Sequence, residues 1–356
     1  MRESGIELLR IILMLQVVFL HICDYGEYSV YPPDKGGVDC LVYWIMMFMS
    51  RTTVYVYIAL TGYFSVSSKS NQSLRSVLQK VKKIYLPMLF FSITIPLIMW
   101  STGQEAFSLS DLISAFLPVL SRTWYFMTLY IIVLILSPFV NRCINNLSKR
   151  EYTVLIAILF FIFCIWDMLA NLPPIDEVIN LEKVIDTDSG KSLYGVLFMY
   201  ILGGYLRLNV KSYDKPRLIY LIAFVALALL NTALVYIIPD YTKVVFYNDN
   251  PISVIQGVCL VLFFRDLRFK SRVVNHIAAL NLGVYMIHEH PMVRDFIWDK
   301  VFGFTQEEAF YTSFPLYVFE ALGICLLVFT VSAVLEQVRR GLWAAAGRLR
   351  RCGLRQ

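Results

Sequence analysis

The fold is decided by the first apolar stretch of the chain, MRESGIELLRIILMLQVVFLHICD, which runs from Met1 to Asp24. It is long enough to cross a bilayer as a helix, which takes about 20 apolar residues. Two ionisable residues interrupt it, Arg10 inside the apolar run and His21 near its far end. Such residues are costly in a membrane helix and usually face the protein interior, so both are candidates for function.

Arg10 and His21 are eleven residues apart, which is about three helical turns. They therefore share one helix face, roughly 16 Å apart along the axis at ~1.5 Å rise per residue. A cation at one depth and a titratable base at another predict a site that reaches across the membrane. Two plainer interpretations stay open. Arg10 can pair with Glu7 or Glu3 on its own helix face, and His21 can be an interfacial residue without a role.

The composition of the whole chain is that of a membrane protein. Of its 356 residues 58% are hydrophobic and only 16% are charged, whereas soluble domains carry about 25% charged residues. The net charge of +6 comes from Lys and Arg in loops, so we expect no nucleic-acid partner. Seven Cys lie scattered without CxxC spacing, so we expect no metal site. We therefore predict an all-α fold in the lipid bilayer.

The apolar runs predict one bundle of about ten transmembrane helices, over residues 5–23, 40–65, 84–101, 124–144, 152–170, 192–208, 216–238, 251–268, 276–291 and 313–336. Their connections alternate in charge, and the basic ones are 66–83, 142–151, 207–217 and 265–275. The positive-inside rule then places both termini in the cytoplasm. The predicted domains are a transmembrane domain over 1–338 and a basic cytoplasmic tail over 339–356.

This topology assigns a depth to the polar residues within the spans. It places Arg10 in the inner half of the membrane and His21 in the outer half. The outer half also receives polar and aromatic residues from three other helices, namely Arg51, Trp124, Tyr125, Tyr285 and His288. We predict that these residues surround His21. Trp124 taken alone is most often a residue of the aromatic belt at the membrane surface.

Arg51 falls near the middle of the span predicted over 40–65, beyond easy snorkelling. A buried arginine needs an anionic or carbonyl partner. No acid of the first, second or fourth span is deep enough, so the expected partner is Glu320 or an oxygen of a ligand. At the outer end of the ninth span, Glu289 and His290 are expected to face water.

At these residues the sequence resembles acyltransferase family 3, the integral-membrane O-acyltransferases that modify bacterial surface glycans. The opening RESGIELLRIILMLQVVFLH resembles the start of that family, in which an R-x-x-x-L-R segment precedes a His eleven residues later, and Arg10 and His21 fall on this pattern. Four further segments resemble family motifs in the expected order: RTTVYVYIALTGYF, KVKKIYLP, TWYFMTLY and LGVYMIHEHP. The second-helix turn LTGYF departs from the family, in which Ser-Gly is more usual.

The resemblance implies that the protein transfers an acyl group, most often acetyl, from cytoplasmic acyl-CoA to a hydroxyl of a surface polysaccharide or lipid-linked sugar. It implies a multi-pass protein of the bacterial cytoplasmic membrane. His21 and Arg51 are then the catalytic residues. The substrate-binding residues are Arg10, Trp124, Tyr125, Tyr285 and His288.

Several roles of these residues stay open at this point. His21 can act as a general base or can carry the acyl group as an acyl-imidazole. Arg51 or His288 can stabilise the oxyanion. The phosphates of acyl-CoA have basic partners at the inner face beside Arg10, namely Lys82, Lys83, Arg142, Arg207 and Arg265.

A second class of function, a transporter of an amino acid or a lipid-linked sugar, also accommodates intramembrane Arg and His residues. The absence of an inverted repeat from the sequence speaks against it. A purely structural role would leave Arg51 unexplained.

Overall fold

The computed structural model describes residues 3–25, 38–68, 73–172, 175, 178–179, 181–182, 188, 190–238, 241–245, 247–303 and 316–353. Within these ranges the regular structure is helical and contains no strand. Most of the acidic connection predicted over 24–39, and the start of the helix predicted at 313, lie outside the described residues. The predicted all-α fold is thus confirmed for the part of the chain that the structure describes.

The helices follow one another as α1 (Gly5–Tyr25), α2 (Val38–Ser50), α3 (Thr53–Ser65), α4 (Leu74–Ser101), α5 (Leu109–Phe116), α6 (Tyr125–Asn145), α7 (Lys149–Phe160), α8 (Asp167–Asn171), α10 (Leu193–Leu208), α11 (Leu218–Ile237), α12 (Thr242–Val245), α13 (Pro251–Arg265), α14 (Arg272–His288), α15 (Pro291–Asp295) and α16 (Leu316–Gly353). Two π-helical segments, η3 (Phe161–Trp166) and η4 (Phe296–Val301), continue α7 and α15.

Seven helical segments among the described residues are long and apolar enough to cross a membrane. They are α1, α2 with α3, α4, α6, α7 through α8, α11 and α16. The apolar helices α10 and α13 are shorter than these. The protein is therefore a multi-pass membrane protein, and the count of ten spans stays a prediction.

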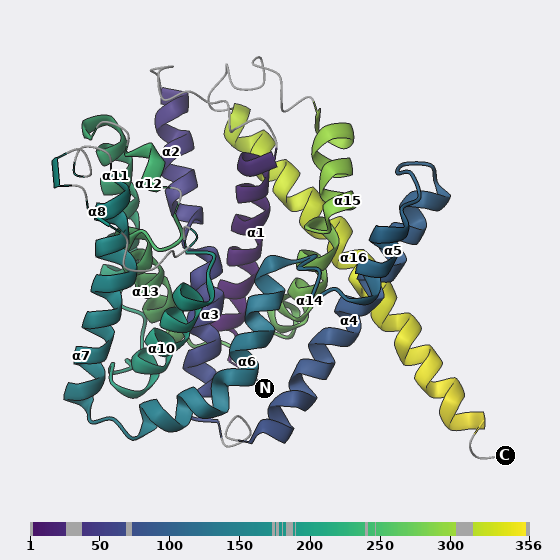
Figure 1. The fold of residues 1–356 in the computed structure, drawn as a ribbon, viewed down its shortest axis with the longest axis horizontal. Helices are drawn as coiled ribbons and strands as arrows, with labels where there is room; N and C mark the ends of the chain where they lie inside the picture. Colours follow the sequence, from purple (N-terminus) through teal and green to yellow (C-terminus); the bar gives the residue numbers. More distant parts are fainter. Residues whose placement is uncertain are drawn as a thin grey trace.

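Helix α1 lies in the middle of the bundle (Figure 1). It packs against α14, α16, α13, α2 and α3. The side chains of Leu9, Leu13, Val18 and Ile22 are fully buried, and their spacing of four or five residues makes one continuous apolar stripe. This stripe anchors α1 in the core and leaves the face of Arg10 and His21 free to line a cavity.

The helix predicted over 40–65 is broken at Arg51 and Thr52. Helix α2 ends at Ser50 and α3 begins at Thr53, with the two residues between them in a turn. The Arg51 amide still donates to the carbonyl of Met47 at 2.9 Å. Threonine is a weak helix former because its hydroxyl competes for backbone hydrogen bonds. The break moves Arg51 from the middle of a helix to a junction between two.

Helices α3 and α10 pack with their backbones in contact through two glycines. A Cβ atom at Gly62 would lie 1.9 Å from the carbonyl oxygen of Tyr200, and one at Gly203 would lie 1.9 Å from that of Ala59. Such a close approach is possible only without side chains, as in other membrane helix pairs. The pair therefore forms a tightly packed part of the bundle next to the cavity.

Several of the basic connections lie together at one end of the bundle. The amide of Ser4 donates to the Phe269 carbonyl at 2.8 Å, and Arg265 donates through Nη2 to the Lys211 carbonyl at 2.7 Å. Asn145 likewise donates to the carbonyl of Val66 at 3.1 Å. Both chain ends lie in the lower part of Figure 1. These contacts agree with the predicted alternation, while the assignment of this end to the cytoplasm stays a prediction.

Helix α16 continues without interruption past residue 338, where the predicted tail begins. Arg339 is buried, and its Nε and Nη2 donate to the two carboxylate oxygens of Glu336 at 2.7 and 2.8 Å. Its guanidinium lies 4.6 Å from the ring centroid of Trp343. Arg340 also pairs with Glu336, at 2.6 Å, and donates to the carbonyl of Ala279 on α14. The first two arginines beyond residue 338 thus attach α16 to the bundle.

Candidate functional site

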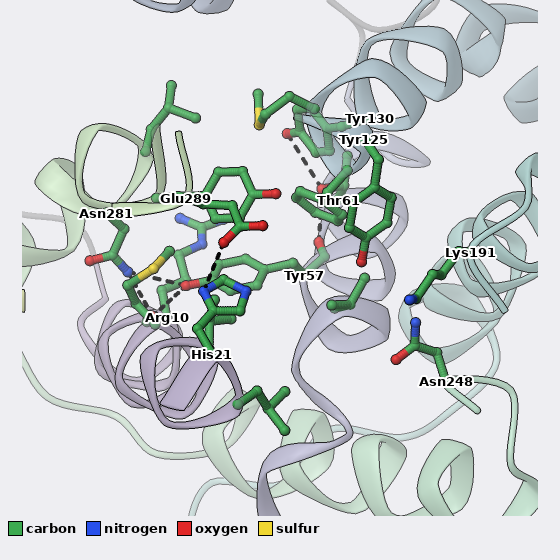
Figure 2. A pocket seen from close by; sticks show the side chains of 18 of the residues that line it. Arg10, His21, Tyr57, Thr61, Tyr125, Tyr130, Lys191, Asn248, Asn281 and Glu289 are labelled. Carbon is green, nitrogen blue, oxygen red and sulfur yellow. Dashed lines mark hydrogen bonds and ion pairs between the residues drawn. The ribbon is translucent and has the colours of Figure 1, made fainter. Parts of the chain in front are cut away.

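A cavity of about 360 Å³ lies along α1 and follows it from Arg10 to Tyr25 (Figure 2). Its walls come from α1, α3, α6 and α14, with Ile84 of α4 also in the lining. The segments that precede α10 and α13 contribute Lys191 and Asn248. The cavity therefore extends along about four turns of the helix that organises the chain.

Arg10 and His21 both line this cavity, as expected for residues that share one helix face. Arg10 also has the plainer partner that the sequence offered, because its Nη1 lies 2.9 and 3.1 Å from the two carboxylate oxygens of Glu7. The Arg10 side chain keeps 23% of its surface exposed. An ion pair with Glu7 and an accessible guanidinium thus coexist.

Two residues that the sequence did not single out hold the backbone of α1 at Arg10. The Tyr57 hydroxyl and the Asn281 amide each donate to the Arg10 carbonyl at 2.6 Å. These bonds tie α1 to α3 and α14 at the same depth. The sequence could have identified these two residues because an Asn and a Tyr lie within apolar helices at the depth of Arg10.

His21 is held through one ring nitrogen only. Its Nδ1 lies 3.1 Å from Nε2 of His288 and 3.1 Å from Oε2 of Glu289. Nδ1 of His288 lies 2.6 Å from the Val284 carbonyl, which can only accept, so this nitrogen carries the His288 proton. Nε2 of neutral His288 is then an acceptor.

Nε2 of His288 thus accepts from His21 Nδ1, which places the His21 proton on Nδ1 and a lone pair on Nε2. Figure 2 shows this second nitrogen of His21 turned toward the open middle of the cavity, on the side of Tyr125. A neutral imidazole in this tautomer can accept a proton from a group in the cavity.

The expectation that Glu289 and His290 face water was wrong. Only 6% and 4% of their surfaces are exposed. Helix α14 ends at His288 and Pro291 starts α15, so Glu289 lies in the junction between the two helices, where it contacts the end of α1. Oε1 of Glu289 lies 3.4 Å from the Tyr25 hydroxyl and 3.9 Å from Nη1 of Arg294.

Arg51 has an acidic partner that we expected to be too shallow, because its Nη2 lies 3.4 Å from Oδ1 of Asp24 at the end of α1. An oxygen of a ligand, one of the two expected partners, stays a prediction. The break between α2 and α3 explains the difference, because it lets Arg51 reach the outer end of α1. Arg51 and Asp24 both line the cavity, one turn of α1 beyond His21.

The family model described as the acyltransferase domain matches residues 3–336. This chain belongs to acyltransferase family 3. No curated protein and no solved structure gave a match. The family match covers every residue that lines the cavity and makes the chain a membrane acyltransferase, which favours an enzyme over the transporter alternative.

In this acyltransferase, four of the aromatic and histidine residues predicted to surround His21 divide into two pairs. Tyr125 and Tyr285 line the cavity. Trp124 and His288 lie behind the lining, with 1% and 0% of their surfaces exposed. Trp124 packs its ring against that of His290, with centroids 5.5 Å apart. His288 reaches the cavity only through its contact with His21.

The basic residues proposed for phosphate binding in the acyltransferase also differ in their surroundings. Arg265 is nearly buried and pairs with Asp266 at 3.1 Å. It also donates to one carbonyl in the last turn of α10 and to two carbonyls of the connection after α10. Arg207 donates to the Tyr63 hydroxyl at 3.2 Å. Lys82 and Lys83 are exposed near the start of α4. Arg142, near the end of α6, is exposed as well. Lys82, Lys83 and Arg142 are therefore the accessible members of this predicted set, and phosphate binding stays a prediction.

Proposed function

We propose that this protein transfers an acetyl group from cytoplasmic acyl-CoA to a hydroxyl of a surface polysaccharide or lipid-linked sugar, in a bacterial cytoplasmic membrane. The observation that supports this most is the single cavity with Arg10 toward one end and, three turns along α1, His21 with its free Nε2. A donor and an acceptor that approach from opposite ends would meet beside His21.

In the direct route, His21 Nε2 takes the proton of the acceptor hydroxyl while the hydroxyl oxygen attacks the thioester carbonyl. The carbon–sulfur bond then breaks, and the imidazolium returns the proton to the departing thiolate. Glu289 beside Nδ1 stabilises the imidazolium during the step. Arg51, one turn further along α1, is the cation available for the oxyanion.

In the alternative route, His21 Nε2 attacks the thioester carbonyl, the carbon–sulfur bond breaks, and the proton lost from Nδ1 converts the departing thiolate to the CoA thiol. The acetyl group then stays on His21 as an acyl-imidazole until the acceptor hydroxyl takes it. The two routes differ in whether the protein becomes labelled without acceptor. Purified enzyme mixed with [¹⁴C]acetyl-CoA alone and quenched rapidly will carry label only in the second route, and His21→Ala will remove that label.

The donor end of the cavity suits a phosphate-bearing molecule. Arg10 keeps part of its guanidinium accessible, and Ile84, which also lines the cavity, directly follows the exposed Lys82 and Lys83. Cations at this end would hold the phosphates of acyl-CoA while its thioester extends toward His21.

The decisive experiment uses membranes that contain the protein, [¹⁴C]acetyl-CoA and envelope glycan from a strain that lacks the gene. We expect label in the glycan with the wild-type protein and a loss of more than about 10³-fold with His21→Ala, because the alkyl hydroxyl is then left without a base. His276→Ala is the matched control, since His276 is exposed and lies away from the cavity. Normal transfer by His21→Ala would exclude His21 from the chemistry.

A further inference from the structure

The outer end of the cavity carries two polar residues that the proposed chemistry does not use. Lys191 and Asn248 line the side opposite His21, and Figure 2 shows their side-chain ends close to each other. Lys191 lies just before α10 and Asn248 just before α13. They come from different segments than His21, Arg51 and Glu289, so this end of the cavity is built separately.

The turn that carries Lys191 is pressed against the segment that carries Asn248. Gly190 has a φ of +79°, and a Cβ atom there would lie 2.8 Å from the Asp249 amide nitrogen and 2.9 Å from Cβ of Asn248. The Lys191 amide closes the turn by donating to the Asp188 carbonyl at 2.9 Å. Only glycine fits both this conformation and this contact. The fold therefore fixes where Lys191 leaves the backbone.

The charges that line this end are balanced except for Lys191. Arg51 lies beside Asp24, and Glu289 lies within 3.9 Å of Arg294. Lys191 is exposed, and its ammonium has no hydrogen bond or ion pair among the described residues. Among the described residues, no acid oxygen lies within 4.0 Å of the Lys191 ammonium, although Asp188 belongs to the same turn. An anionic group of a ligand would supply an ion-pair partner.

We propose that the acceptor of this enzyme is an acidic glycan, and that Lys191, with Asn248 beside it, binds a carboxylate or phosphate close to the hydroxyl that is acylated. This inference rests on the proposed function and adds the chemical class of the acceptor to it. A neutral sugar would leave Lys191 without a partner in the enzyme–acceptor complex. An acidic sugar would place its charge at Lys191 and its hydroxyl toward His21.

The test uses de-O-acetylated envelope polysaccharide from a strain that lacks the gene, in three forms. One is native, one has its carboxylates reduced to alcohols, and one has its phosphates removed with hydrofluoric acid. We expect the wild-type enzyme to acetylate the native form and to lose at least about tenfold in kcat/KM on one of the treated forms, as for one charge-assisted hydrogen bond. The treated form on which kcat/KM falls shows whether the recognised anion is the carboxylate or the phosphate.

Lys191→Gln should raise the KM for the native polysaccharide by at least about tenfold with kcat little changed. The Lys191→Gln variant should use native and treated polysaccharide with equal kcat/KM. The Lys191→Arg variant should retain most of the wild-type preference for the native polysaccharide. Lys215→Gln, on the exposed connection after α10, is the matched control and should behave as wild type.

Equal use of all three forms by the wild-type enzyme, or a Lys191→Gln variant indistinguishable from Lys215→Gln, would overturn the proposal. If the wild-type enzyme labels no form while the strain still makes the polysaccharide, the proposed function itself fails, and the acidic acceptor fails with it. The two failures are distinguishable because only the second abolishes all transfer.

Discussion

At the scale of single residues, the site depends on which nitrogen of His21 carries the proton. Glu289 and His288 both contact Nδ1 at 3.1 Å and leave Nε2 to the cavity. They are positioning residues, because neither needs to touch a substrate to set the tautomer. Residues of this kind commonly change rates by 10- to 100-fold in comparable sites, so their removal is a sensitive test.

Replacing Glu289 with Gln removes the carboxyl group that can carry a counter-charge beside Nδ1 of His21 and puts an uncharged amide in its place. We expect kcat for acetyl transfer to fall by roughly 10- to 100-fold while the KM for acetyl-CoA stays unchanged, since the imidazolium loses its counter-charge. Steady-state kinetics on detergent-purified protein measure both constants. Glu320→Gln, an acid that does not line the cavity, is the control, and equal kcat values for the two variants would contradict the role of Glu289.

Replacing Arg51 with Lys keeps the charge but loses the planar guanidinium. We expect a loss of about 10²-fold in kcat if Arg51 faces the oxyanion. Asp24→Asn separates this role from the ion pair, because it removes the Arg51 partner while leaving the guanidinium in place. If Asp24→Asn and Arg51→Lys lower kcat by the same factor, Arg51 acts only through Asp24.

At the scale of helices, the glycine contact between α3 and α10 makes a sharp prediction. Gly62→Ala would place a Cβ atom 1.9 Å from the Tyr200 carbonyl oxygen, so the two helices must separate. We expect a lower melting temperature in detergent and a destabilisation of about 1–3 kcal/mol or more, as for other overpacked sites. Gly323→Ala on α16 is the control because no atom lies within 4 Å of its Cβ position. Equal melting temperatures for the Gly62→Ala and Gly323→Ala proteins would show that the two helices can move apart freely.

Hydrophobic patterning predicted most helices well. It failed where contacts between residues distant in sequence determine the local structure. Residues 40–65 are apolar enough to read as one span, and the contact that the break at Arg51 permits is with Asp24, which is distant in sequence. The burial of Glu289 likewise depends on contacts with other segments, among them that with Tyr25. Arg10 and His21, in contrast, follow from helical spacing alone, since both lie on one continuous helix.

At the scale of the whole molecule, the contacts of Ser4 with residues 269 and 271 bring the N-terminus to the connection between α13 and α14. If the positive-inside rule holds, this end faces the cytoplasm. Single cysteines in a background without the native cysteines test it. A membrane-impermeant maleimide should label Thr102→Cys in intact spheroplasts and Lys215→Cys only after permeabilisation. The opposite pattern would invert the topology.

The continuous cavity beside His21 has a consequence for energetics across the membrane. In the proposed reaction a formal acylium unit passes outward to the glycan while one proton passes inward to the thiol, so the exchange moves no net charge. A membrane potential contributes about 2.3 kcal/mol per elementary charge per 100 mV only to steps that move charge. Proteoliposomes clamped with valinomycin at opposite potentials should therefore acetylate acceptor at equal rates, and the thioester alone would drive the modification of the outer surface.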